Sequence, residues 1–306
     1  MDFITCMKTK KYLLMEGALG ERLKREYGLA FDSHLDMAAL VYSEAGRNAL
    51  AALWNGYMEI AKRYDLPFLA TTPTRRTNRE RIQKTPYDAS IIRTNVDFLR
   101  RIQEESGQKM YVGALVGCRG DAYTGKGCLS RQESCEFHRW ETELFAQAGV
   151  DFFYAALMPT LEEAAGMVQA IQETNIPCIL SFTIQADGCL VDGTPIAQAI
   201  EYIDTLTDGY PVCYMTNCVH PAIVYEALSQ PVNRCEIVRE RFSGIQANTA
   251  LLPYSQLDGS RELKTSDPDE LACHLAKLGE ICRLKIVGGC CGTDERHMEE
   301  IAKLLN

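Results

Sequence analysis

Two adjacent cysteines stand among glycines near the end of the 306-residue chain, in the stretch Gly288-Gly289-Cys290-Cys291-Gly292. Because neighbouring cysteines form a disulfide with each other poorly, we expect these thiols to serve another purpose. A third cysteine, Cys218, follows Asn217 farther upstream. Three thiolates that converge suit a zinc ion and leave one of its four positions open. A closed structural zinc site and three unrelated buried thiols remain as alternatives.

The type of ligand decides the chemistry expected at such a site. Three thiolates exceed the double charge of zinc, so the ion would be a weak Lewis acid for activating water, and a hydrolase would be expected to use histidine or carboxylate ligands. A fourth thiol, supplied by a substrate, would instead bind as a thiolate that is still electron-rich enough to attack carbon. The three cysteines therefore favour transfer of an alkyl group to sulfur.

The cysteines need a scaffold that brings them together, and the chain offers eight short apolar runs with the length of strands. Three of these runs open with a proline, which strands tolerate at the first position. Runs that are apolar on both faces are typical of parallel strands. The eight runs are residues 12–15, 66–70, 110–116, 152–156, 176–180, 210–214, 242–246 and 284–287.

Helical patterns separate these runs. A Ser-x-x-Glu at residues 130–133 and a Thr-x-x-Glu at residues 160–163 have the spacing of capping boxes, and Gly107 and Gly149 follow helical patterns as C-terminal stops. Strands and helices alternate along the chain without a linker, which favours one closed (β/α)8 barrel over a doubly wound sheet. We therefore predict an α/β fold with a single TIM barrel domain over residues 1–306.

Functional residues of a TIM barrel lie on the loops that follow the strands, at their carboxyl ends. Cys218 comes directly after the sixth predicted strand, and Cys290 and Cys291 follow the eighth through two glycines. All three are therefore expected on the same rim of the barrel. Four other cysteines fall inside predicted strands or a predicted helix, where we expect buried apolar roles: Cys178, Cys213, Cys273 and Cys282.

Composition narrows the range of partners. The chain has 41 acidic and 32 basic side chains, a formal net charge of −9, so we expect no nucleic-acid partner and no membrane partner. No segment has the apolar run of a signal peptide or a membrane span, and thirteen cysteines without a disulfide framework suit a reducing compartment. We predict a cytoplasmic protein that binds small molecules, and a homo-oligomer remains open.

The segment from Gly288 to Thr293, together with Asn217-Cys218, resembles the zinc signature of the homocysteine S-methyltransferase family. That family includes betaine-homocysteine methyltransferase and the homocysteine module of cobalamin-dependent methionine synthase. The likeness extends along most of the chain. It covers residues 15–20 after the first strand, 123–125 in a Tyr-Thr-Gly loop, 181–195 after the fifth strand and 247–249 after the seventh.

The resemblance implies a zinc-dependent S-methyltransferase. In this interpretation Cys218, Cys290 and Cys291 hold Zn2+ and are the catalytic residues. A methyl group moves from a cationic donor, a sulfonium or a quaternary ammonium, to a zinc-bound thiolate. The acceptor is homocysteine or a related small thiol or selenol, and the product is methionine or an analogous thioether, as in methionine biosynthesis.

The resemblance also implies which residues contact the substrates, because their positions match the family's segments. These residues are Glu16, Gly17, Tyr123, Asn217 and Asn248. A sixth candidate, Arg75, follows the second predicted strand, where a guanidinium could clamp a substrate carboxylate. A solvated helix start is the alternative for this arginine.

Two positions depart from the family pattern. The family usually has an aspartate where Glu16 stands, and a glutamate that helps to hold the amino group of homocysteine where Ala156 stands. Loss of that carboxylate removes a contact of about 1.5–3 kcal/mol. We therefore expect weakened recognition of the acceptor's ammonium group. A non-catalytic zinc-binding or regulatory protein on the same barrel and a corrinoid-linked methyltransferase subunit are the alternative functions.

Overall fold

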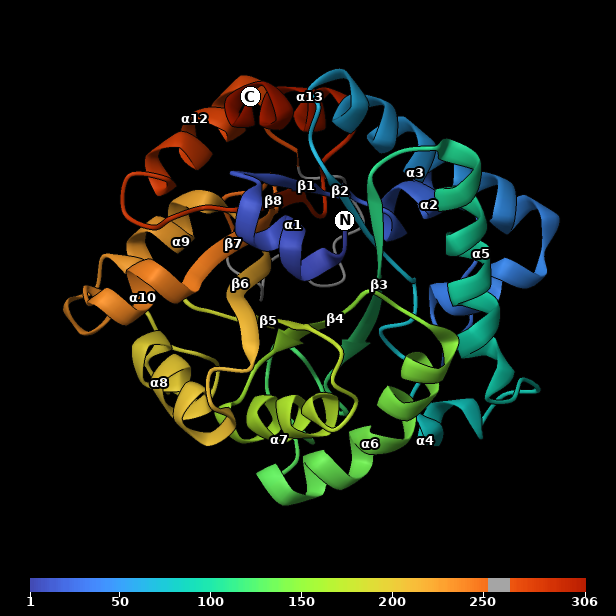
Figure 1. The fold of residues 1–306 in the computed structure, drawn as a ribbon, viewed down its shortest axis with the longest axis horizontal. Coiled ribbons are helices and arrows are strands. Elements are labelled where there is room, and N and C mark those ends of the chain that lie inside the picture. Colours follow the sequence, from blue (N-terminus) through green and yellow to red (C-terminus); the bar gives the residue numbers. More distant parts are fainter. Residues whose placement is uncertain (253–264) are drawn as a thin grey trace.

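Eight parallel strands close into a barrel in their sequence order (Figure 1). The computed structural model describes residues 1–252 and 265–306. Each strand pairs with the next, and β8 pairs with β1, so the predicted TIM barrel is confirmed. The strands are β1 (Leu13–Met15), β2 (Phe68–Thr71), β3 (Met110–Gly117), β4 (Phe152–Met158), β5 (Cys178–Phe182), β6 (Pro211–Val219), β7 (Phe242–Ala247) and β8 (Ile286–Gly289).

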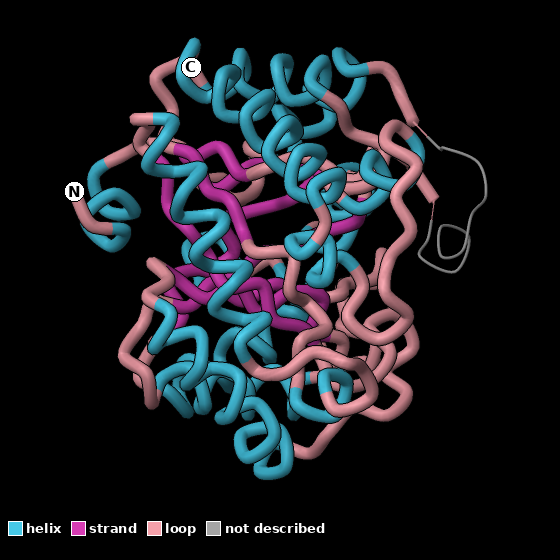
Figure 2. The backbone as a smooth tube through the Cα atoms, turned by 90° about the vertical axis from the view of Figure 1, so that its right-hand side faces the viewer, coloured by secondary structure: helices cyan, strands magenta, loops and turns pink. Residues whose placement is uncertain are grey.

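Helices surround the barrel, and Figure 2 shows the strands enclosed by them. They are α1 (Phe3–Thr9), α2 (Gly20–Arg25), η1 (Met37–Tyr42), α3 (Glu44–Arg63), α4 (Arg79–Ile82), α5 (Ser90–Ser106), α6 (Arg131–Ala148), α7 (Leu161–Gln172), α8 (Ile196–Thr207), α9 (Pro221–Leu228), η2 (Pro231–Asn233), α10 (Glu236–Arg241), α12 (Pro268–Leu278) and α13 (Glu295–Leu305). Within the described ranges, no helix combines the length and the apolar character needed to cross a bilayer.

The first helix closes the N-terminal end of the barrel. Figure 1 shows α1 lying across this opening, and its residues Phe3 and Met7 belong to the apolar cluster inside the barrel. The Phe3 ring stacks on Phe152 with 4.7 Å between centroids and meets Tyr111 edge-on at 5.6 Å. Phe3 and Met7 thus fill the barrel interior at this end, and the side chains at the carboxyl ends of the strands converge at the opposite end.

Most predicted helix boundaries agree with the structure. Ser130 and Glu133 form the predicted capping box at the start of α6. Gly107 and Gly149 end α5 and α6 in the left-handed conformation, with φ of 61° and 83°. Because glycine has no Cβ, it adopts this conformation without steric cost.

The second predicted capping box is wrong. The hydroxyl of Thr160 is buried without a hydrogen-bond partner among the described residues. Glu163 accepts a hydrogen bond from the Arg119 backbone N–H instead, and its carboxylate lies 3.3 Å from His138 Nε2. Burial alone would lower the pKa of His138, but its contacts with Glu141 and Glu163 outweigh burial and raise the pKa to about 9. The Glu163 carboxylate, which the capping box would need, instead belongs to a buried charged network between α6 and α7.

Of the four cysteines that the sequence predicts to be buried, three are buried in the structure. Cys178 and Cys213 are buried in β5 and β6, as expected. Cys282 is buried too, although it lies in the turn after α12 rather than on a helix. Cys273 lies on α12 but is exposed, so the expectation of a buried role there is wrong.

Candidate functional site

Three sulfur atoms meet at the carboxyl ends of the strands. Within the described part of the chain, Cys218, Cys290 and Cys291 form the one group of three or more potential metal ligands, with all ligand atoms within 4.8 Å of one another. The sulfurs of Cys218 and Cys291 are 3.7 Å apart. Cys218 is buried and Cys291 is the most exposed of the three. The rim position that the sequence predicts for these residues is thus the one that the structure has.

Cys218 does not follow the sixth strand, as predicted, but lies inside it. β6 continues to Val219, and its register against β7 shifts between Asn217 and Val219. Cys218 takes a φ of 60°, a left-handed conformation that costs a non-glycine residue free energy. This irregularity interrupts the alternation of the strand at the point where the thiol is placed beside the other two.

Asn217 holds the strand ends around Cys218 in place. Its side-chain oxygen accepts hydrogen bonds from the hydroxyl of Ser181 at 2.6 Å and from the backbone N–H of Leu157 at 3.3 Å. Leu157 has a φ of 55° and lies where the register of β4 against β5 shifts. One buried amide therefore connects irregular ends of β4 and β6 with β5, and Asn217 is a positioning residue.

Cys290 and Cys291 lie on a tight turn between β8 and α13. The backbone N–H of Cys290 donates to Ala247 O at 2.8 Å, and the Thr293 hydroxyl donates to Cys290 O at 2.7 Å. Gly292 has a φ of 84°, and its N–H donates to the carboxylate of Glu21 at 2.7 Å. Both faces of the turn are thus hydrogen-bonded, which fixes the direction of the two thiols.

The glycines before the cysteine pair serve close packing. A Cβ at Gly288 would lie 2.7 Å from Met15 O, and one at Gly289 would collide with the Thr293 side chain. The glycines therefore let β8 pack closely against β1 and against the turn that starts α13.

The three thiols influence one another's protonation. Hydrogen bonds from Cys290 and Cys291 lower the pKa of Cys218, despite its burial. The same contacts with Cys218 raise the pKa values of Cys290 and Cys291. These contacts therefore favour the thiolate form at Cys218.

Two polar side chains contact the Cys218 sulfur. The Tyr123 hydroxyl donates to it at 3.9 Å, and the side-chain amide of Asn248 donates to it at 3.7 Å. The negative charge on Cys218, together with burial, raises the pKa of Tyr123 well above its usual value, so this hydroxyl remains a donor. The structure thus brings both predicted residues into the cysteine group.

Glu16 has a buried carboxylate that is hydrogen-bonded within the protein, unlike a carboxylate that is free to bind a substrate. Its side chain is buried, Trp54 Nε1 donates to one carboxylate oxygen at 2.6 Å, and the backbone N–H of Thr71 donates to the other at 3.1 Å. The Thr71 hydroxyl also donates to this second oxygen. Burial raises the pKa of Glu16 to about 7 against the effect of these donors. The carboxylate is therefore engaged by the protein, and burial favours its protonated form.

The last two predicted residues support the rim from outside the cysteine group. A Cβ at Gly17 would lie 2.7 Å from the Tyr57 ring, so this glycine makes room for Tyr57. Arg75 Nη2 lies 4.0 Å from Asp36, and the positive charge of Arg75 acts to lower the pKa of Tyr123. Arg75 is thus a partly exposed cation at the rim.

Sequence reasoning missed one side chain of the barrel interior. Tyr154 is fully buried in β4, and its hydroxyl has no hydrogen-bond partner of ordinary geometry among the described residues. Tyr154 and Ala156 lie two residues apart and share the apolar cluster inside the barrel. The alternation along β4 is the signal that could have placed this hydroxyl on the inner face.

The sequence matches the family described as Homocysteine S-methyltransferase over residues 13–305, which is nearly the whole chain. The chain belongs to the homocysteine S-methyltransferase family. The family membership that the cysteine signature predicts is therefore confirmed.

Individual relatives are distant. Homocysteine S-methyltransferase YbgG of Bacillus subtilis (strain 168) is 24% identical over 192 residues, which are 60% of this chain and 56% of that relative. The match thus spans little more than half the length of the relative. The crystal structure of the metallated form of homocysteine methyltransferase MmuM from Escherichia coli is similar with a TM-score of 0.75, at 19% identity and 98% coverage of both chains. The apo form has a TM-score of 0.67 at 18% identity and 97% coverage of both chains. This likeness confirms the fold.

Proposed function

We propose that this protein is a zinc-dependent S-methyltransferase that moves a methyl group from a cationic donor to the thiolate of a small acceptor. The observation that carries this proposal is the group of three cysteine sulfurs at the rim of a barrel of this family. The similar MmuM structure is a metallated form, which supports a bound metal in a barrel of this kind.

The donor set fits zinc in number, type and spacing. Thiolates are ligands that zinc prefers, and a catalytic site keeps three protein ligands and one open position. In a tetrahedral site with zinc–sulfur bonds of about 2.3 Å, sulfurs lie about 3.8 Å apart. The separation of 3.7 Å between the Cys218 and Cys291 sulfurs agrees with this requirement. Cys218, Cys290 and Cys291 would hold the ion.

Zinc held by these three thiolates would supply a fourth position that favours the deprotonated, nucleophilic form of an acceptor thiol. In the transfer, the acceptor sulfur forms a bond to the methyl carbon while the bond from that carbon to the donor breaks. The electron pair of the broken bond leaves with the donor, which becomes neutral. This outcome requires a donor with a positively charged sulfur or nitrogen, so we propose a sulfonium or a quaternary ammonium.

The residues around the cysteines have supporting tasks in this proposal. Tyr123 and Asn248 donate to the Cys218 sulfur, which disperses its charge and holds its orientation. Asn217 fixes the strand ends that carry Cys218. Arg75 is the rim cation that is suited to an acceptor carboxylate.

The acceptor in this proposal is homocysteine or a related small thiol or selenol with weak recognition of its ammonium group. Ala156 is uncharged and 1% exposed, and the Glu16 carboxylate already accepts hydrogen bonds from Trp54 and Thr71. The inner face of the barrel near Ala156 therefore lacks a free carboxylate from these two positions.

A direct assay tests the proposal. Zinc-loaded protein is incubated with S-methylmethionine, S-adenosylmethionine or betaine as donor, and with homocysteine or 4-mercaptobutyrate as acceptor. We expect a methyl thioether from at least one pair, and no product after the metal is removed by a chelator. Stoichiometric zinc without methyl transfer from any donor would instead support the non-catalytic alternative.

A further inference from the structure

A cavity of about 1030 Å3 opens at the N-terminal end of the barrel, opposite the cysteines. It lies between α1, the first residues of β6 and β7, the turn before β8, and the ends of α12 and α13. This volume lies just above the range of about 300–1,000 Å3 for small-molecule sites. The cavity has no part in the proposed methyl transfer, because it lies at the end of the barrel that α1 closes.

The lining of this cavity has a charge opposite to that of the whole chain. Two glutamates, Glu240 and Glu280, line it together with six cations, so the local excess is positive in a protein with a formal net charge of −9. The six cations are Lys8, Lys10, Lys11, Arg241, Arg283 and Lys285.

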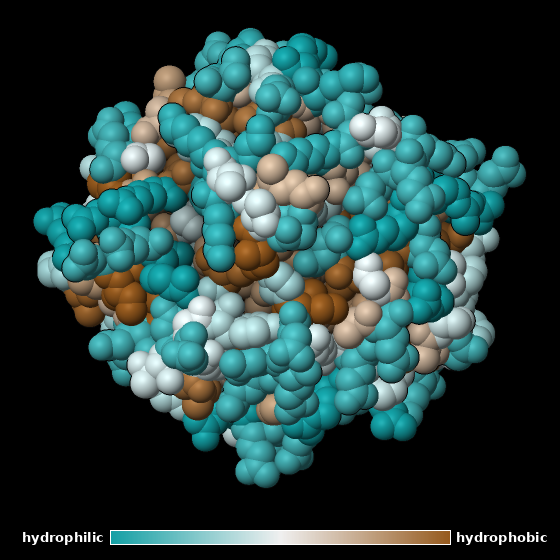
Figure 3. Space-filling view, in the orientation of Figure 1, coloured by the Kyte–Doolittle hydropathy of each residue, from teal (hydrophilic) through white to brown (hydrophobic). Residues whose placement is uncertain are grey.

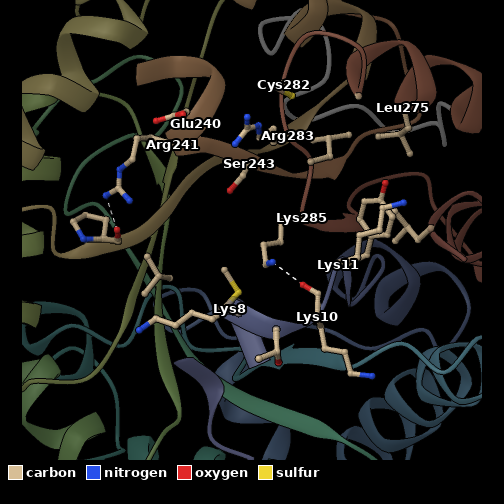
Figure 4. Close-up of a pocket in the computed structure, with 18 of the residues that line it drawn as sticks. Lys8, Lys10, Lys11, Glu240, Arg241, Ser243, Leu275, Cys282, Arg283 and Lys285 are labelled. Carbon is tan, nitrogen blue, oxygen red and sulfur yellow. Dashed lines mark hydrogen bonds between the residues drawn. The ribbon is translucent and has the colours of Figure 1, made fainter. Parts of the chain in front are cut away.

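Part of this positive charge has a structural role. Arg241 forms an ion pair with Asp204 at 2.7 Å and donates to Pro211 O at 2.7 Å. Lys285 Nζ donates to Lys10 O at 2.6 Å, which uses one of its three protons (Figure 4). Arg241 is thus occupied, whereas Lys285 retains two donors.

Two of the other four cations also have partners, since Lys10 lies 4.0 Å from Asp65 and Lys11 lies over the Tyr12 ring. Over residues 1–252 and 265–306, neither Lys8 nor Arg283 forms an ion pair with a carboxylate, and both side chains are exposed. Lys8 lies in the last turn of α1, where a cation balances the helix dipole. That explanation does not extend to Arg283 and Lys285, which lie in the turn before β8.

The arrangement of these groups suits one ligand of moderate size. Figure 4 shows Lys285 between Arg283 and Ser243, which lie above it in this view, and Lys8 and Lys10, which lie below it. Apolar side chains that are at least partly exposed, such as Ile4, Val212 and Leu304, contribute to the lining. Figure 3, which shows the face that carries α1, has apolar surface near its centre between hydrophilic side chains.

We propose that this cavity binds a small organic anion that carries a diphosphate or longer phosphate chain. Lys8, Arg283 and Lys285 would contact the phosphates, because ammonium and guanidinium groups form strong charge-assisted hydrogen bonds with phosphate oxygens. The apolar part of the lining would cover the organic part of the ligand. The ligand binds away from the cysteines and takes no part in the methyl transfer.

Calorimetric titration of the full-length, zinc-loaded protein tests this site with three probes: pyrophosphate, ATP and adenosine. We expect pyrophosphate and ATP to bind, with ATP the tighter, and adenosine not to bind. Affinity for both anions should fall as the salt concentration rises, because the contacts are largely electrostatic. Absence of binding by both anions would overturn the proposal.

Two double variants test whether the anions bind in this cavity. Lys8→Ala with Arg283→Ala should weaken binding of both anions about tenfold or more, since two charged contacts are removed. The control, Arg101→Ala with Lys109→Ala, removes two exposed cations of α5 and of the turn before β3. Equal weakening in the two double variants would mean that the anions bind by net charge, which contradicts the proposal. Arg283→Ala alone, at an exposed position, repeats the test if the double variant is unstable.

Discussion

Glu16 illustrates how the meaning of one residue depends on its partners. Its position in the chain indicates a substrate ligand, but three donors from Trp54 and Thr71 already point at its carboxylate. Burial nevertheless raises the pKa to about 7. A carboxylate that must be desolvated in this way is a poor free counter-ion for an ammonium group. We therefore assign Glu16 a structural role beneath the rim, together with Trp54.

The titration of Glu16 predicts a pH-dependent stability. Its folded pKa of about 7 lies above the ordinary glutamate value of 4.5, so the folded state holds the proton more tightly than the unfolded chain. The contribution of Glu16 to stability is therefore fully present below about pH 4.5 and is lost as the pH rises through 7, a loss of at most about 3 kcal/mol. The Glu16→Gln variant lacks this contribution. We expect its unfolding free energy, measured in urea between pH 5 and 8, to gain on that of the wild type as pH rises. A constant difference would contradict the assignment.

The cysteine group makes a prediction about metal content. The Cys290→Ala and Cys291→Ala variants should each lose most of the single zinc ion expected per chain, because two thiols hold zinc far less tightly than three. Elemental analysis of the purified proteins measures this loss. Cys273→Ala is the matched control, since Cys273 is exposed on α12 and distant in sequence from the cluster. Variants of Cys290 and Cys291 that fold and keep stoichiometric zinc would exclude the proposed site.

Ala156 makes a prediction about acceptor choice. Ala156→Glu places a carboxylate on the inner face of β4, where Ala156 is buried beside Tyr154. The ratio of activity with homocysteine to activity with 4-mercaptobutyrate, which lacks the amino group, should rise about tenfold or more. Ala156→Gln is the control of equal size without charge. An unchanged ratio in the folded, zinc-loaded Glu variant would show that another residue already binds the ammonium group.

At the scale of elements, the sequence predicts the strands well and their ends less well. All eight apolar runs overlap strands of the barrel, because burial on both faces leaves a strong signal. The irregular end of β6 leaves no such signal in the sequence, because Cys218 adopts a positive φ although it is not glycine. Register is decided by neighbouring strands, so the local sequence around Cys218 does not reveal it. The cap at Thr160 failed for the same kind of reason, because Glu163 bonds to the distant His138.

Substitution of Asn217, which holds the strand ends around Cys218, should lower both the stability of the protein and its affinity for zinc. Asn217→Ala removes the acceptor for the Ser181 hydroxyl and the Leu157 N–H, which are buried. We expect a loss of about 1–3 kcal/mol in unfolding free energy and weaker zinc binding, because Cys218 loses its support. Urea denaturation and zinc titration against a competing chelator measure the two effects. Ser181→Ala, which removes only one of the two donors, should have the smaller effect on both; a larger effect would contradict this view of Asn217.

On the scale of the whole molecule, the barrel separates its two ends. The cysteines lie at the carboxyl ends of β6 and β8, whereas the opposite end is closed by α1 and bears the basic cavity. The interior between them is packed with apolar side chains from most of the strands. A change at one end should therefore alter global stability without altering the chemistry at the other end.

Substitution of Phe3 tests whether the two ends of the barrel are independent. Its ring is 4% exposed, stacks on Phe152 and contacts Tyr111, so Phe3→Ala should lower the unfolding free energy by about 3–5 kcal/mol. Under conditions where the variant is folded, we expect the zinc content and the methyl-transfer rate to equal those of the wild type. Tyr27→Ala is the control, because this ring is 41% exposed and its loss should change stability little. Loss of zinc from the folded Phe3 variant would mean that the two ends are coupled through the packed interior.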